Sequence, residues 1–285
     1  MTIHHVVKAR NFDSVFEPAK GSSSAKLTIK LKVELFALDP ELADAPGGGE
    51  HPVRLVNNKH LVKRGLVKDA DKDRIECRTW VTHEWDEFRP KFKKMVEMSW
   101  NNQMILLPGG PRPGAGSHEK DYKTMLASPR APAHVECALE LELTSNGAHA
   151  EIEVAHKVDK RREFRSEMTR IVDTDVEFET TTMKGFRDRK IFQVTAAHEV
   201  GHWLRDLGKP HFNHVDWEYA KTLPPDQRGS SAYGHVLGKR VAMMGDGNLC
   251  TEHEAKPWLG RIGRHVSTLS GWSFMHRIHF RQRFP

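Results

Sequence analysis

The sequence has few cysteines and no long apolar run, and each absence excludes a class of protein. Its 285 residues contain three widely spaced cysteines (Cys77, Cys137 and Cys250) and no Cys-x-x-Cys pair, which excludes a disulfide framework and a cysteine-based structural zinc site. No stretch approaches the roughly 18 apolar residues that a membrane span needs. The first residues lack a basic region followed by an apolar one, so we expect no classical signal peptide. These features predict a cytoplasmic protein or one exported by a specialised route.

The sequence also lacks a concentrated charge of one sign. Its net charge is +6, and acidic residues interrupt the densest basic cluster, at positions 157–165. No recognisable nucleic-acid-binding module accompanies this cluster, so we expect a solvated face and no nucleic-acid partner. Hydrophobic residues make up 38% and charged residues 29% of the chain, which is typical of a globular protein with a core.

The spacing of apolar residues predicts strands in the first part of the chain and helices in the last. Alternation predicts a strand at 27–37 and a β-hairpin made of 135–143 and 149–158 around a turn at 145–147, and an apolar run predicts a strand at 104–107. Helical spacing predicts helices at 85–100, 194–207 and 252–266, with Pro90 near a helix start and Pro257 either at a helix start or at a kink. The Pro- and Gly-rich segments 39–52 and 108–117 are expected to be loops. The pattern predicts an α+β fold.

The predicted helix at 194–207 carries the clearest chemical motif. His198 and His202 are four residues apart, so both imidazoles lie on one helix face, one turn apart, and can reach one zinc ion. Glu199, about 100° around the helix from His198, is placed to take a proton from a zinc-activated water. Nine of the 18 histidines follow Gly185, where this motif lies. The sequence therefore predicts one catalytic Zn²⁺.

A catalytic zinc needs a third protein ligand, and several residues are candidates. Our first choice is His211, because Gly208 ends the predicted helix and the segment 208–211 can turn the chain back to the metal. The alternatives lie further along the chain: His214 and Asp216, or a glutamate from Glu218, Glu252 and Glu254.

These residues resemble the metzincin clan of zinc peptidases. The metzincin motif is His-Glu-x-x-His-x-x-Gly-x-x-His followed by a methionine-bearing turn. Here the motif is His198-Glu199-Val200-Gly201-His202 with Gly208 and His211, but five residues rather than two separate His202 from Gly208. The segment 241–247 contains Met244, which the resemblance makes the Met-turn residue. Tyr219 and Tyr233 are candidate oxyanion donors, as a tyrosine is in some metzincins, or simply packed aromatics.

The resemblance implies an organisation and a function for the whole chain. It implies a mixed β-sheet with an active-site helix at 192–207 and a helical C-terminal subdomain within a peptidase domain at 81–285, preceded by a β-rich region at 1–80. It also implies a zinc metalloendopeptidase acting on a protein or peptide, of the kind found among bacterial effectors and toxins, which would engage secretion machinery or a cognate inhibitor. The hairpin before the helix could supply the edge strand on which metzincins align substrates. The alternative is a non-catalytic zinc-binding interaction protein with a structural site.

Overall fold

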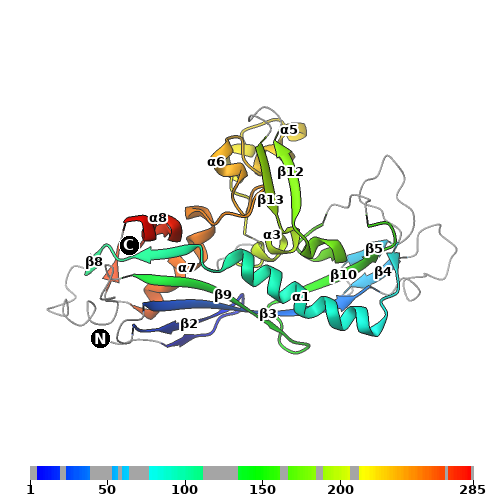
Figure 1. The fold of residues 1–285 in the computed structure, drawn as a ribbon, viewed down its shortest axis with the longest axis horizontal. Helices are drawn as coiled ribbons and strands as arrows, with labels where there is room; N and C mark the ends of the chain where they lie inside the picture. Colours follow the sequence, from blue (N-terminus) through cyan, green and yellow to red (C-terminus); the bar gives the residue numbers. More distant parts are fainter. Residues whose placement is uncertain are drawn as a thin grey trace.

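A nine-stranded mixed sheet forms the base of the computed structural model, and most helices pack around it (Figure 1). The structure describes residues 5–19, 24–38, 53–56, 60–63, 77–111, 134–160, 166–183, 189–205, 212–266 and 269–283. The strand order is β1-β2-β3-β9-β7-β15, and β10 pairs with β3, β6 and β11. The fold is therefore α+β with a mixed sheet, as the sequence predicts. Within the described ranges, no helix is long and apolar enough to cross a membrane.

The sheet and three small strand pairs have these bounds. The strands of the large sheet are β1 (Val6–Val7), β2 (Asp13–Glu17), β3 (Ala25–Ala37), β6 (Cys77–Arg78), β7 (Met104–Leu107), β9 (Val135–Leu143), β10 (Ala150–Lys157), β11 (Arg170–Val172) and β15 (Ser273–His276). The small pairs are β4 (Val53–Val56) with β5 (His60–Lys63), β8 (Gly110–Pro111) with β14 (Leu269–Ser270), and β12 (Glu179–Met183) with β13 (Arg189–Gln193).

Most of the helices lie in the second half of the chain, and most of those are short. They are α1 (Thr82–Trp100), η1 (Asp173–Val176), α3 (Thr195–Gly201), α4 (Trp217–Ala220), α5 (Pro225–Ala232), α6 (Leu237–Arg240), α7 (Glu252–His265) and α8 (Arg277–Arg283). In Figure 1, α5, α6 and the β12–β13 pair stand on one side of the large sheet, with α3 at their base.

Strand β3 is the centre of the large sheet. It contains the predicted strand at 27–37, and its alternating apolar residues, such as Leu27, Ile29 and Leu31, are fully buried. One buried cluster includes residues from β2 and β3 together with residues from α1, α3 and α7. Strands from both sides of residue 80 thus share one sheet, whereas the predicted division into regions 1–80 and 81–285 stays a prediction about folding units.

The predicted hairpin at 135–158 is wrong, although both of its strands exist. Strand β9 runs parallel to residues 25–33 of β3, and β10 runs parallel to residues 33–37 of the same strand. The bend between them has a positive φ of 65° at Gly147, yet β10 continues in the direction of β9 instead of reversing. Both strands find their partner in β3, which is distant in sequence, so tertiary pairing overrides the local turn signal. Strand β7 pairs with the first two residues of β9, and the side chains of Asn101 and Glu97 bond the backbone of Leu139 and Leu141 beyond them, so β9 does not offer a free edge.

The two long helices form where apolar spacing predicts them. Helix α1 buries Phe88, Phe92, Val96 and Trp100 and begins three residues before the predicted start. Pro90 is therefore in its interior, where it removes one backbone hydrogen bond; both Pro90 and Asp86, whose carbonyl loses this bond, are exposed to water. Helix α7 begins with a capping box, in which Thr251 and Glu254 bond each other's backbone N–H groups, and it also contains its proline.

The motif helix is shorter than predicted at both ends. Residues 192 and 193, which the resemblance places in the helix, belong to β13 (Arg189–Gln193), and α3 spans Thr195–Gly201. After Gly201 the α-helical hydrogen-bond pattern gives way to the tighter 3₁₀ pattern, because the amides of Trp203 and Leu204 donate to the carbonyls three residues before them. The carbonyl of His202 accepts from the amide of Phe212 at 2.8 Å, so the chain returns to the helix end there. The loop at 39–52, most of the loop at 108–117, and residues 206–211 lie outside the described residues.

Candidate metal centre

Helix α3 places His198 and His202 side by side in a buried position. The two side chains are 3% and 7% exposed, and their ring centroids are 5.0 Å apart. His202 caps the helix but keeps helical backbone angles, so its side chain stays in phase with His198. A hydrogen bond from α1 holds α3 in place: the indole N–H of Trp100 on α1 donates to the carbonyl of Ala197 on α3 at 3.0 Å.

Backbone carbonyls orient both imidazole rings. His198 Nδ1 lies 2.7 Å from the carbonyl oxygen of Met243, and His202 Nδ1 lies 2.5 Å from that of Phe212. A carbonyl only accepts, so each Nδ1 carries the proton and each Nε2 keeps its lone pair. This is the arrangement usual for histidines that bind metals.

The surroundings of the buried His198 Nε2 atom indicate whether a metal ion fits the site. This nitrogen is inaccessible to water and has no hydrogen-bond partner. Burial also lowers the pKa of His198 and so favours the neutral imidazole that binds metals. An unsatisfied buried acceptor in a neutral ring is costly without a ligand, and a metal ion removes that cost. The residues present therefore fit a metal ion.

His214 completes a cluster of three histidines. One ring nitrogen from each of His198, His202 and His214 lies within 4.8 Å of the others, which is close enough to bind one metal ion. The ring centroid of His214 is 5.2 Å from that of His198 and 4.8 Å from that of His202. Of the third ligands considered from the sequence, the structure thus brings His214 to the pair. His211 lies outside the described residues, so its role stays a prediction.

The carboxylates considered as third ligands are bonded to other groups. Asp216 is 2% exposed, and its carboxylate accepts from the backbone amide and ring of His235 and from Lys239. Burial opposes its ionisation, but the bonds from Lys239 and His235 lower the pKa of Asp216 on balance. Glu254 is fully buried and accepts from Met244 and Thr251. Glu218 and Glu252, in contrast, are exposed.

Met244 lies directly against the motif helix. A Cβ atom on Gly201 would be 2.5 Å from the sulfur of Met244 and 2.9 Å from a ring atom of Trp100, so only glycine permits this approach. The amide of Met244 donates to Glu254 at 3.0 Å, and the preceding carbonyl, from Met243, is the one that orients His198. The segment predicted as a Met-turn therefore packs under α3 and holds one of its histidines.

The two tyrosines have different surroundings. The ring of Tyr233 lies 4.1 Å from that of His214 and 5.6 Å from that of His198, centroid to centroid. Tyr219 is 40% exposed and stacks on His235 at 4.0 Å instead. Of the two predicted oxyanion donors, Tyr233 is the one beside the histidines.

Sequence reasoning missed the groups that orient the histidines. Two of them, the carbonyls of Met243 and Phe212, are backbone atoms that carry no residue-type signal. Glu254, which the sequence suggested only as a metal ligand, acts one step away: its place in the Thr251 capping pattern does not reveal that its carboxylate also accepts from the Met244 amide. No protein-family model, curated protein or solved structure matches the chain, so its interpretation rests on its own geometry.

Proposed function

We propose that this protein is a zinc-dependent, metzincin-like metalloendopeptidase. The observation that carries the proposal is the convergence of His198, His202 and His214 next to Glu199. Three histidine ligands suit zinc, and three protein ligands leave a position open for chemistry. When bound, zinc supplies a Lewis acid that polarises a carbonyl oxygen and acidifies water.

The remaining steps belong to the chain's own residues. Glu199, 6% exposed and adjacent to His198, accepts the proton of the attacking water and passes it to the leaving amine. This carboxylate lies one residue from a ligand in the sequence. Tyr233, packed against His214, donates its hydroxyl hydrogen to the oxygen that becomes negative during the attack. A protein or peptide is the substrate.

Replacing Glu199 by glutamine tests this function. We expect Glu199→Gln to retain its metal while hydrolysis of a quenched fluorescent peptide library falls by about 100- to 10,000-fold, the range for losing a general base. Glu17→Gln is the control, because Glu17 is an exposed carboxylate at the end of β2. Retained turnover in Glu199→Gln would remove Glu199 from the mechanism.

A non-catalytic zinc-binding protein is the competing function. It requires a fourth protein ligand, because a structural zinc site is closed. X-ray absorption of the zinc-loaded protein separates the two: three nitrogen ligands with one oxygen from water support the peptidase, and four protein ligands support the structural site. Within the described residues, the cluster that could hold a metal contains three histidines and no fourth ligand.

We also propose that the peptidase acts as an exported bacterial effector, an extension that rests on the metzincin resemblance. Expression in a susceptible bacterial cell tests it, with growth as the measurement. We expect wild type to stop growth and Glu199→Gln to permit it. Equal toxicity of the two proteins would exclude a proteolytic killing mechanism.

A further inference from the structure

Asp216 is a buried carboxylate that the proposed chemistry does not use. Its side chain is 2% exposed, and it follows His214 by two residues without belonging to the three-histidine cluster. A carboxylate is rarely buried this deeply unless its partners replace the water that it loses, because an uncompensated buried charge is costly. The partners of Asp216 therefore indicate its role.

Three donors from one later segment hold the Asp216 carboxylate. Its Oδ2 atom accepts from the backbone amide of His235 at 3.0 Å and from the ring Nδ1 of the same residue. Its Oδ1 atom accepts from the ammonium group of Lys239. Both oxygens therefore bond the segment 233–239, which begins with Tyr233.

Asp216 also bonds the chain immediately before Tyr233. Its backbone amide donates to the carbonyl of Ala232 at 2.9 Å, whereas its carboxylate accepts from the amide of His235. The turn made of Tyr233 and Gly234 is thus held at both ends by one residue. Without the carboxylate, one of the two ends would be released.

The backbone of His214 is joined to Asp216 through Val215. The amide of Val215 donates to the carbonyl of Met244 at 3.0 Å, and the carbonyl of His214 accepts from the amide of Trp217 at 3.2 Å. These bonds restrict the chain on both sides of Asp216, so a shift of Asp216 moves His214 as well.

Close backbone packing leaves the turn at 233–234 little room to move. Gly234 has a φ of 124°, and a Cβ atom on it would lie 2.6 Å from a backbone nitrogen of α6. A Cβ atom on Gly245 would lie 2.6 Å from the carbonyl oxygen of Tyr233. The turn therefore presents the ring of Tyr233 to that of His214 in one position, with centroids 4.1 Å apart.

We infer that Asp216 is a positioning residue, which holds His214 and Tyr233 in the arrangement that the metal centre needs. The inference rests on the proposed function, because it takes His214 as a metal ligand and Tyr233 as the oxyanion donor. Asp216 acts only through these two residues. An asparagine in its place has one accepting oxygen, so it cannot accept from both His235 and Lys239, and the attachment loosens.

A double-mutant cycle on the zinc affinity of the full chain tests this role. Asp216→Asn should lower the affinity about tenfold, the lower end of the range for groups that orient metal ligands, because Asp216 acts through the backbone of His214. In a His214→Ala background, the same change should have no further effect, since the ligand that it positions is gone. Competition with a chromogenic chelator gives the four affinities. Equal losses in both backgrounds, as a general loss of structure would cause, or no loss in either would overturn the inference.

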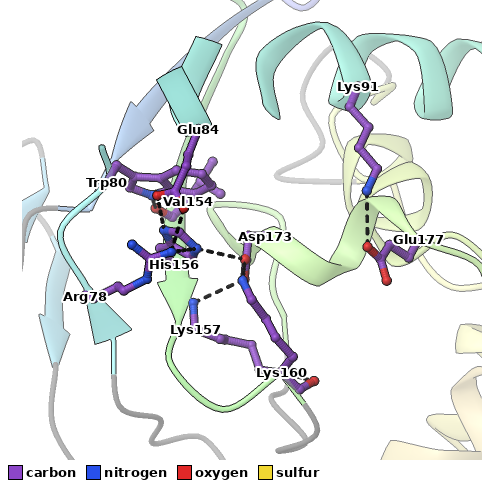
Figure 2. A network of polar contacts seen from close by, with 10 residues as sticks. All are labelled: Arg78, Trp80, Glu84, Lys91, Val154, His156, Lys157, Lys160, Asp173 and Glu177. Carbon is purple, nitrogen blue, oxygen red and sulfur yellow. Dashed lines mark hydrogen bonds and ion pairs between the residues drawn. The ribbon is translucent and has the colours of Figure 1, made fainter. Parts of the chain in front are cut away.

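Asp173→Asn is the matched control. Asp173 on η1 is also a largely buried carboxylate that pairs with a lysine, Lys160, and accepts from a backbone amide, that of Lys157, at 3.1 Å (Figure 2). It does not belong to the histidine cluster, so its replacement should leave zinc affinity unchanged. If Asp216→Asn does not fold, His235→Phe takes its place in the cycle with the same expected pattern. This variant keeps a ring to stack on Tyr219 and removes the ring's bond to the carboxylate.

The zinc measurements need no turnover, so they separate the failure of this inference from that of the proposed function. A wild type that binds zinc but cleaves no peptide would overturn the function, and the four affinities would still decide the role of Asp216. A wild type that binds no zinc would overturn both. In an active wild type, Asp216→Asn at saturating zinc should lower kcat about tenfold with little change in KM, because an oxyanion donor acts in the transition state. An unchanged kcat would contradict the role of Asp216 toward Tyr233.

Discussion

Two of the regions that hold buried histidines fix the imidazole rings in opposite ways. In the metal centre, the backbone carbonyls of Met243 and Phe212 bind the Nδ1 atoms of His198 and His202. At His156, whose ring stacks on Trp80, the guanidinium of Arg78 donates to the Nε2 atom. A carbonyl oxygen accepts from the protonated ring nitrogen, so the lone pair of the other nitrogen stays available. A guanidinium donates to the nitrogen that carries the lone pair, so the protonated nitrogen stays available instead.

The difference shows that the partner of a buried histidine, more than its burial, decides its chemistry. A metal ion needs the lone pair of a neutral ring, and His198 has one without a partner. Burial lowers the pKa of His156, so its ring is also neutral, but Arg78 occupies its lone pair. We therefore expect metal at the histidine cluster and none on His156.

Removing one histidine from each region gives the largest expected contrast. His202→Ala should lower zinc affinity by more than about 100-fold, because losing a direct ligand costs more than losing a group that only orients one. His156→Gln should leave zinc content unchanged. Plasma mass spectrometry after mild dialysis measures both. Equal zinc loss in the two variants would show that the two regions are not chemically distinct.

Comparing His214→Ala with His211→Ala identifies the third ligand. The structure brings His214 to the pair, so His214→Ala should lose most of its zinc, by about 100-fold in affinity. Competition with a chromogenic chelator gives the two affinities. If only His211→Ala loses zinc, His214 is a neighbour of the site and the first choice from the sequence is right.

Gly201→Ala should have an intermediate effect on the metal centre. The added methyl would overlap the Met244 sulfur and Trp100, and such overpacking typically costs about 1–3 kcal/mol of unfolding free energy. We also expect about tenfold weaker zinc binding, because α3 must shift against the segment that orients His198. Gly147→Ala is the comparison: its Cβ meets no atom within 4 Å, although its positive φ carries strain. It should reduce stability with no change in zinc affinity. Urea denaturation and chelator competition measure the two quantities.

The smallest expected effect is on the pH dependence of stability. The pKa of His156 is lowered from its ordinary value to about 4, so the unfolded chain binds a proton between about pH 6.5 and pH 4 that the folded chain does not. This contribution to stability is complete above pH 6.5 and is lost as the pH falls to 4. His156→Gln should flatten this part of the pH profile of the melting temperature. His279→Gln, in an exposed residue of α8, should keep the wild-type slope. An unchanged slope in His156→Gln would show that other groups control it.

Local spacing was sufficient for part of the fold. The strand at 27–37, the helices at 85–100 and 252–266, and the pair His198 and His202 could all be predicted, because each pattern repeats within one element. The extent of α3 could not, because β13 pairing and the bond between His202 and Phe212 set its ends.

What the sequence determined by itself is thus the chemistry on α3: two histidines in phase, with a glutamate between them. Tertiary structure alone decided the rest. Strands β9 and β10 both pair with β3, the carbonyls that orient the histidines are backbone atoms, and His214 reaches the pair from a later segment. His156 on β10 likewise meets residues of β6, α1 and η1. The physical reason is that helical phase depends on neighbouring residues, whereas these contacts depend on which distant segments bury one another.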